Sequence, residues 1–277
     1  LDKKCVVVFA SDNGICEEGV SGAPASVTIT QFLNMTKGLT GINVFSSQAG
    51  SDVILVDVGV NGDLPYDQIV NKKIRRGTRN MLKEAAMTRQ EAVQALETGI
   101  DMVRELVAQN YMVIGTGEMG IGNTSTSATV IMSLTGRSAE EVVGKGVGML
   151  EPDYQHKKEV LKEVIKRRQP NPKDPIDVLS QVGGYDIGAI AGVFLGCAYY
   201  KIPTVIDGVI SVAGALLAAR LNPLCVQYMF PSHLSAEPGY AIAIQELGLT
   251  PYFILDMRLG EGTGCPLAFY LMDNAMA

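Results

Sequence analysis

Several residue types are rare or missing in this sequence of 277 residues. It contains no tryptophan, only two histidines and 6% aromatic residues, and its five cysteines include no CxxC pair. Paired cysteines and histidines make most structural zinc sites, so we expect no metal. An odd number of scattered cysteines is typical of reduced thiols, which favours a cytoplasmic location.

Positive charge and long hydrophobic runs are also scarce. The chain has 23 basic and 29 acidic residues, a net charge of -6. Proteins that bind nucleic acid usually carry a basic face, so we expect no nucleic-acid partner. An anionic ligand would instead need a local site of positive charge or free amides rather than an overall positive field. No stretch of about 18 apolar residues runs without a charged residue, glycine or proline, which predicts no membrane span.

Short apolar runs recur along the chain, which is 47% hydrophobic. Most are continuous rather than alternating, as in strands that are covered on both faces of a parallel sheet. A chain of this length can bury about 75% of the surface that its unfolded form exposes. The predicted strands are 5–9, 53–58, 111–114, 204–206, 226–230 and 252–255.

Helical patterns lie between these runs. The segment 88–109 begins with Thr88 and Glu91, which are spaced as in a capping box, and carries an apolar stripe. Further helices are predicted at 128–134, 154–168, 187–199 and 210–221, with a second capping box at 138–141. The alternation of strands and helices predicts a doubly wound α/β sheet, mainly parallel, with a helical accessory part. No linker separates two domains, so we expect 1–277 to form one unit.

Glycine is abundant, and many of the thirty glycines follow predicted strands. Open α/β sheets bind ligands at the carboxyl ends of their strands. The segment 115–126 follows a strand, precedes a helix and formally matches GxGxxG, which suits an anion held by backbone amides. A dinucleotide fingerprint would need an acid at the end of the next strand, and Glu140 and Glu141 stand instead in a helix-start pattern. A nicotinamide-dependent oxidoreductase is therefore poorly supported, and a simple tight turn stays an alternative.

Two glutamates lie beside glycines at predicted strand ends. Glu261 stands between Gly260 and Gly262, and a partly buried carboxylate there would be a usable general base. A surface turn explains that pattern equally well. Glu118 lies inside the glycine-rich segment and would repel a phosphate, so we expect it to contact a hydroxyl or to orient a neighbour.

Two further segments carry candidate side chains. His233 and Glu237 could act as acid, base or orienting groups, and a structural histidine is the alternative. The segment 11–21 is acidic and could bind ribose hydroxyls or form a solvated turn. Lys145 and Lys157 are candidate phosphate ligands, although a helical lysine is often only solvated.

These segments together resemble the nicotinate-nucleotide:dimethylbenzimidazole phosphoribosyltransferase family of cobamide synthesis. The matching segments are 20–38, 48–50, 56–59, 117–124, 235–239 and 258–264. They follow the family order across almost the whole chain, and 117–124 and 258–264 are the most specific. The resemblance implies a Rossmann-like α/β domain, a small helical domain with parts near the chain ends, and a dimer with active sites near the interface.

The resemblance also implies the reaction and its residues. Nicotinate mononucleotide and an aromatic base or phenol would give an α-ribotide and nicotinate, with no cofactor. Glu261 would be the general base, with Glu118 in the same pocket. The implied nucleotide contacts are Gly120, Ile121, Gly122, Asn123, Thr124, Ser125, Gly146, Gly148, Lys157 and Gly262. The implied contacts with the acceptor base are Ala23, Pro24, Gln31, Met119 and Leu259.

The chemistry agrees with this residue set. The pyridinium of nicotinate mononucleotide is already a cationic leaving group and needs neither an acid nor a metal. The enzyme must hold the phosphate, support positive charge at C1′ and remove one proton from the nucleophile. Attack on the face opposite nicotinate converts a β-linkage into an α-linkage, and holding both substrates in line supplies much of the rate.

Three residues depart from the family pattern. Asn13 and Tyr240 stand where histidines are common, and Ala23 stands where some members have a serine. We take that serine to pair with the second ring nitrogen of a benzimidazole. A buried group without its partner costs about 1–3 kcal/mol. The acceptor range is therefore expected to shift, with phenol or p-cresol joining benzimidazoles and adenine.

The family usually has a helical segment before its first strand, which here begins near Cys5. Either such a segment belongs to the protein but not to this sequence, or a partner chain completes the small domain. The second possibility predicts a subunit of a heteromeric phenol or base phosphoribosyltransferase.

Overall fold

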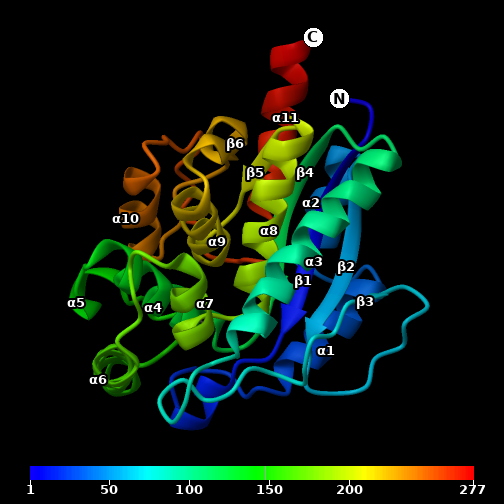
Figure 1. The fold of residues 1–277 in the computed structure, drawn as a ribbon. Coiled ribbons are helices and arrows are strands. Elements are labelled where there is room, and N and C mark those ends of the chain that lie inside the picture. The colour runs from blue at the N-terminus through cyan, green and yellow to red at the C-terminus, as the bar shows by residue number, and fades with distance from the viewer. Residues whose placement is uncertain (147) are drawn as a thin grey trace.

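The computed structural model describes residues 1–146 and 148–277, and six strands among them form one parallel sheet (Figure 1). The strands are β1 (Lys4–Ser11), β2 (Asp52–Gly59), β3 (Val70–Asn71), β4 (Val113–Met119), β5 (Thr204–Ile206) and β6 (Met229–Pro231). Their order is β3-β2-β1-β4-β5-β6, and every neighbouring pair is parallel. This is the order of a doubly wound nucleotide-binding sheet, which confirms the predicted fold class.

Helices cover both faces of the sheet. α1 (Val27–Thr36), α2 (Gly41–Ala49) and α11 (Gly264–Met276) share one hydrophobic core with Val6 and Val8 of β1. α3 (Arg89–Ala108), α4 (Asn123–Thr135), α8 (Tyr185–Tyr200) and α9 (Val209–Leu221) share the other core with Val7 and Phe9. Successive side chains of a strand point to opposite faces, so a continuous apolar run is what a doubly covered strand requires.

The remaining helices are α5 (Ala139–Val142), α6 (Glu151–Arg168), α7 (Pro175–Val182) and α10 (Pro238–Glu246), with 3-10 helices η1 (Gly14–Glu18) and η2 (Pro223–Tyr228). α3 begins as predicted: Glu91 N donates to Thr88 Oγ1 at 3.1 Å, and Thr88 N donates to Glu91 Oε2 at 2.6 Å. α5 begins with a second such box. No helix in the described ranges is both long and apolar enough to cross a membrane.

Two strand predictions are wrong. Residues 252–255 form no strand, and only Phe253 makes an isolated bridge, to His233. The apolar run there is not core, since Ile254 is 79% exposed. The predicted strand 226–230 begins only at Met229, because Asn222 Oδ1 accepts a hydrogen bond from Leu224 N and starts the 3-10 helix η2.

The strand order places a crevice at one edge of the sheet. From β1 the chain continues to β2 and β3 on one side of the sheet, and from β4 it continues to β5 and β6 on the other side. The direction of the strand order therefore reverses between β1 and β4. Ligands bind at this switch point in open α/β sheets. The segments after β1, β4 and β5 all emerge there.

Candidate active site

A cavity of about 200 Å³ opens at the carboxyl ends of β4 and β5. Most of the predicted site residues line it, although they come from distant parts of the chain. The lining ones are Ala23, Gln31, Glu118, Met119, Gly120, Ile121, Gly122, Asn123, Thr124, Gly146, Lys157, Leu259 and Glu261. The topology thus brings together residues that the sequence separates by more than two hundred positions.

Glu261 lines this cavity beside Gln31, where we define one of its two ends, and it is only 7% exposed, so it is not part of a surface turn. Its Oε1 accepts a hydrogen bond from Gln31 Nε2 at 2.7 Å, and its Oε2 accepts one from Ile42 N at 3.0 Å. Ile42 belongs to the first turn of α2, where the helix dipole favours a negative group. Both carboxylate oxygens are therefore held in place.

Hydrogen bonds to Asp207 hold the loop that carries Glu261. Its backbone has a positive φ of 62° at Glu261, and Gly262 N and Gly264 N donate to the two carboxylate oxygens of Asp207 at 3.1 and 2.7 Å. A Cβ atom at Gly117 would lie 2.5 Å from Glu261 O, so β4 needs glycine there. Burial raises the pKa of Asp207 to about 7, and the nearby Glu261 adds to this.

Glu118 joins this loop to the glycine-rich segment. Its Oε1 accepts from Glu261 N at 3.2 Å, and its Oε2 accepts from Asn123 Nδ2. Asn123 Nδ2 also donates to Asp186 Oδ2 at 3.2 Å. Burial raises the pKa of Glu118 to about 8 and that of Asp186 to about 6, because both carboxyls lie among other acids in the interior. Glu118, Asn123 and Asp186 therefore form one buried hydrogen-bonded network.

Lys157 also lines the cavity and is only 1% exposed, unlike an ordinary helical lysine. Its partner Thr124 follows Asn123, which contacts Glu118, and Glu118 contacts Glu261, so we call the surroundings of Lys157 the other end of the cavity. Its Nζ donates to Thr124 Oγ1 at 3.0 Å, and the described ranges offer it no ion pair within 4 Å. Burial lowers the pKa of Lys157 to about 8, although Glu237 partly opposes this. Gly146 lies beside Thr124, and its N donates to Glu237 Oε1 at 3.0 Å.

Four predicted contacts lie outside the cavity lining. Ser125 is fully buried in α4, and Gly262 packs on Gly117 of β4. Pro24 and Gly148 are exposed. The spacing of a motif does not show which of its residues line a cavity, so the contacts of these four with a substrate stay a prediction.

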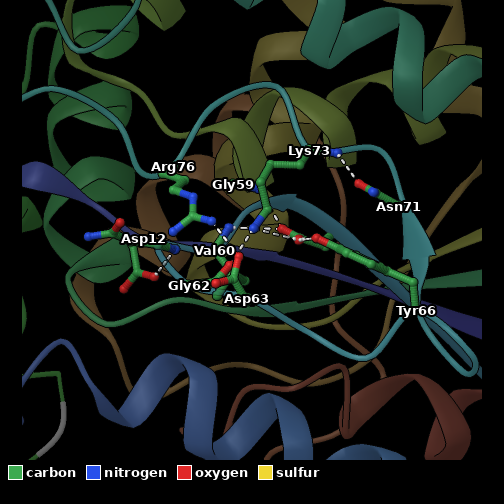
Figure 2. Close-up of polar contacts among 11 residues, drawn as sticks. Asp12, Gly59, Val60, Gly62, Asp63, Tyr66, Asn71, Lys73 and Arg76 are labelled. Carbon is green, nitrogen blue, oxygen red and sulfur yellow. Dashed lines mark hydrogen bonds and ion pairs between the residues drawn. The ribbon is translucent and has the colours of Figure 1, made fainter.

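Of the acidic residues after β1, Asp12 supports the loop that follows β2. Its Oδ2 accepts from Asn61 N at 2.7 Å (Figure 2). Asp12 is not among the residues that line the cavity. Beside it, Asp57 is fully buried, accepts from Tyr66 Oη at 2.8 Å and pairs with Lys73 at 3.2 Å. Neither the predicted ribose contact nor a solvated turn describes Asp12.

The two departures from the family's histidines have different surroundings. Asn13 Nδ2 donates to Ile121 O at 3.2 Å and so ties the segment after β1 to the glycine-rich segment. Tyr240 is fully buried and packs parallel to His233, with ring centroids 6.3 Å apart. Neither side chain lines the cavity.

Sequence reasoning missed one part of the lining, formed by Asp207 and residues 208–211. A signal was present, because Asp207 directly follows the predicted strand 204–206 and therefore stands at a strand end. Lys145 also lines the cavity and pairs with Glu151 at 2.9 Å. No group of three or more His, Cys, Asp or Glu side chains in the part of the chain that the structure describes could hold a metal ion.

Comparisons with known proteins agree on one family. A family model described as phosphoribosyltransferase matches residues 1–277. Proteins named nicotinate-nucleotide--dimethylbenzimidazole phosphoribosyltransferase are 52% identical in Clostridium perfringens and in Clostridium acetobutylicum, covering all of this chain and 77% and 78% of theirs. The crystal structure of CobT from Thermus thermophilus superposes with a TM-score of 0.96 at 39% identity, over 99% of this chain and 83% of that one.

Proposed function

The chain belongs to the nicotinate-nucleotide–dimethylbenzimidazole phosphoribosyltransferase family and is a pentosyltransferase. We propose that the cavity described above binds both substrates and catalyses the transfer between them. The phosphoribosyl group of nicotinate mononucleotide moves to an aromatic acceptor, which gives an α-ribotide for cobamide assembly and releases nicotinate. One observation carries this proposal: a single cavity has a buried lysine without an ion pair among the described residues at one end and a held carboxylate at the other.

The Lys157 end suits the phosphate. A buried ammonium is costly unless an anion lies beside it, and a phosphate is such an anion. Thr124, whose hydroxyl receives the Lys157 hydrogen bond, lies in the first turn of α4. At the start of this helix Asn123 N and Ser125 N donate to Gly120 O and Gly122 O, so the Thr124 amide is the backbone donor left to face a ligand at the same end.

The Glu261 end suits the acceptor. The acceptor atom attacks C1′, the bond from C1′ to the pyridine nitrogen breaks, and nicotinate leaves with the bonding electrons. Glu261 takes the proton that the acceptor loses. Gln31 and Ile42 N fix the direction of its carboxylate, which is what a general base needs in order to meet that proton.

Glu118 lies between the two ends and supports the positive charge of the sugar. Its raised pKa means that it is readily protonated in the free protein, and the cationic pyridinium would favour its ionised form. The negative charge then stands in the cavity when positive charge develops at C1′.

The acceptor is proposed to be a benzimidazole, a purine or a phenol. Ala23, Met119 and Leu259 give the cavity wall beside Gln31 an apolar character. Ala23 has no hydroxyl that could pair with a second ring nitrogen, which favours acceptors without one. Phenol and p-cresol therefore belong in the range beside dimethylbenzimidazole and adenine.

A dimer of two copies is proposed to complete the site. Leu259 lies against the start of α2, and α11 packs on α2. Exposed apolar side chains occur on or beside these segments, namely Leu39 (70% exposed), Val44, Leu259 and Leu271. An apolar patch beside an active site often marks an interface. Sedimentation should give a dimer, whereas an inactive monomer that gains activity with a related chain would support the heteromeric alternative.

Mass spectrometry of the products tests the reaction. The protein is incubated with nicotinate mononucleotide and, separately, dimethylbenzimidazole, adenine, phenol or p-cresol. Nicotinate released only with an acceptor, together with the mass of the ribotide, supports the proposal and names the acceptor. No release with any acceptor contradicts it for this chain alone, and dimethylbenzimidazole exceeding phenols by orders of magnitude contradicts the acceptor range.

A further inference from the structure

Three cavity residues on one segment have no role in the steps above: His233, Ser235 and Glu237. They alternate along one extended segment that follows β6, while the residues between them face away. Leu234 N donates to Phe253 O at 2.8 Å, and Ala236 N donates to Met257 O at 3.0 Å. Alternation of this kind places every second side chain on one face, about 7 Å apart.

The segment runs from one end of the cavity to the other. Glu237 meets Gly146 at the Lys157 end through the hydrogen bond of 3.0 Å. His233 lies at the Glu261 end, since a Cβ atom on Gly264, three residues after Glu261, would lie 2.3 Å from His233 Nδ1. In a nucleotide the ribose lies between the phosphate and C1′, so this segment flanks the sugar, with His233 nearest to C1′.

The hydrogen bonds of His233 assign its tautomer. Ser232 Oγ donates its only proton to Ile206 O at 2.7 Å, so it must accept from His233 Nδ1–H, 3.0 Å away. The proton therefore sits on Nδ1, and Nε2 carries a lone pair. Nε2 has no partner among residues 1–146 and 148–277, and it is not one of the polar atoms sealed in the interior. The ring is only 2% exposed and lines the cavity, so this lone pair is open to a ligand there.

The chemistry of this position excludes most parts of the substrates. Burial lowers the pKa of His233 to about 4, so the ring stays neutral and accepts without donating at Nε2. A phosphate and a nicotinate carboxylate have no proton to give, and the acceptor gives its proton to Glu261. The ribose hydroxyls are the donors that remain, and the 2′-hydroxyl is on C2′, the carbon bonded to C1′.

We propose that His233 Nε2 accepts a hydrogen bond from the 2′-hydroxyl of the bound ribotide, and that this contact selects ribonucleotides over 2′-deoxyribonucleotides. The inference rests on the proposed function and adds a substrate contact to it. As nicotinate departs, positive charge at C1′ makes the neighbouring 2′-hydroxyl a stronger donor. The bond therefore strengthens in the transition state and acts mainly on kcat.

A cycle of substrates and variants tests this. The wild type, His233→Asn and His233→Gln are assayed with nicotinate mononucleotide and with its 2′-deoxy and 3′-deoxy analogues. Asn can still donate to Ser232 but places no atom at the Nε2 position, whereas Gln reaches that position with an acceptor. The preference in kcat for the 2′-hydroxyl over 2′-hydrogen should fall about tenfold in His233→Asn, the loss of one neutral hydrogen bond, and persist in His233→Gln.

Each preference is a ratio within one protein, so the fraction of folded enzyme cancels. The 3′-deoxy ratio should be the same in all three proteins. Equal 2′ preferences in all three would overturn the inference.

The wild type gives an independent reading if the variants do not fold. Its kcat should fall at least about tenfold with the 2′-deoxy analogue, although removing that hydroxyl makes the sugar easier to ionise in water. An unchanged or higher kcat would overturn the inference. A wild type that releases no nicotinate from nicotinate mononucleotide would instead contradict the proposed function.

Discussion

The two ends of the cavity differ in how firmly the protein holds them. At one end, both oxygens of Glu261 accept hydrogen bonds and its loop is fixed through Asp207 and Glu118. At the other end, Lys157 is buried with a single hydroxyl partner. The protein thus fixes the group that we propose as the general base, whereas the end proposed for the phosphate holds a buried ammonium without an ion pair among the described residues, which favours an anion.

The largest effect is expected from Glu261→Gln. The amide keeps the size of the side chain but cannot take a proton, so kcat should fall about 10² to 10⁴-fold, the usual contribution of a general base. The KM for nicotinate mononucleotide should stay within about threefold of the wild type, because the phosphate end is untouched. Steady-state kinetics with each substrate varied would measure both constants. A rise in the KM for nicotinate mononucleotide as large as the fall in kcat would contradict the division of roles between the two ends.

Lys157→Met should act in the opposite way. Losing a buried, charge-assisted hydrogen bond to phosphate should raise the KM for nicotinate mononucleotide about 10 to 100-fold. The same change removes a buried charge that has no ion pair among the described residues, so the thermal unfolding midpoint without substrate should rise. In the wild type, kcat/KM should decline above about pH 8, where Lys157 loses its proton. A variant with a lower unfolding midpoint would contradict this account of the phosphate end.

The raised pKa of Glu118 predicts how stability depends on pH. A carboxyl whose pKa is higher in the folded state stabilises the protein fully below its unfolded pKa of about 4.3, and that contribution is lost as the pH rises toward about 8. The unfolding midpoint of the wild type, relative to that of Glu118→Gln, should therefore fall between about pH 5 and pH 8. A difference that is flat or rises with pH would show that Glu118 is not penalised by burial.

Ala23→Ser should produce the smallest change. The hydroxyl restores a partner for the second nitrogen of a benzimidazole, so the ratio of kcat/KM for dimethylbenzimidazole over p-cresol should rise about 5 to 10-fold. Ala23→Gly is the matched control, since it changes size without adding a polar atom. Competition between the two acceptors in one reaction gives the ratio directly, and equal ratios for Ser and Gly would remove Ala23 from acceptor choice.

Much of the fold follows from local pattern, because buried strands and capped helices carry their own signals. The continuous run at 5–9 and the box at Thr88 and Glu91 both predict the observed elements. The run at 252–255 misleads because its side chains are apolar yet exposed at the surface. The hydrophobic pattern of a segment does not show whether the rest of the fold covers that segment.

The site is less predictable than the fold. The family resemblance implies that Glu118 and Glu261 share one pocket, but it does not identify Asp207, whose role depends on the amides of a loop 55 and 57 positions away. The burial of Lys157 has a similar origin, since its helix reads as solvated and only the packing of α6 turns this one lysine inward. The place of Asp207 after a strand marks it as a candidate, but the partners of both side chains lie far away along the chain and cannot be predicted from local pattern.

Direct binding of nicotinate mononucleotide, measured by isothermal titration without an acceptor, tests most directly that the two ends divide the work. Wild type, Glu261→Gln and Lys157→Met are compared under the same conditions at about pH 7. The account predicts that Glu261→Gln binds as tightly as the wild type and that Lys157→Met binds about 10 to 100-fold more weakly. Weak binding by Glu261→Gln, or undiminished binding by Lys157→Met, would contradict it.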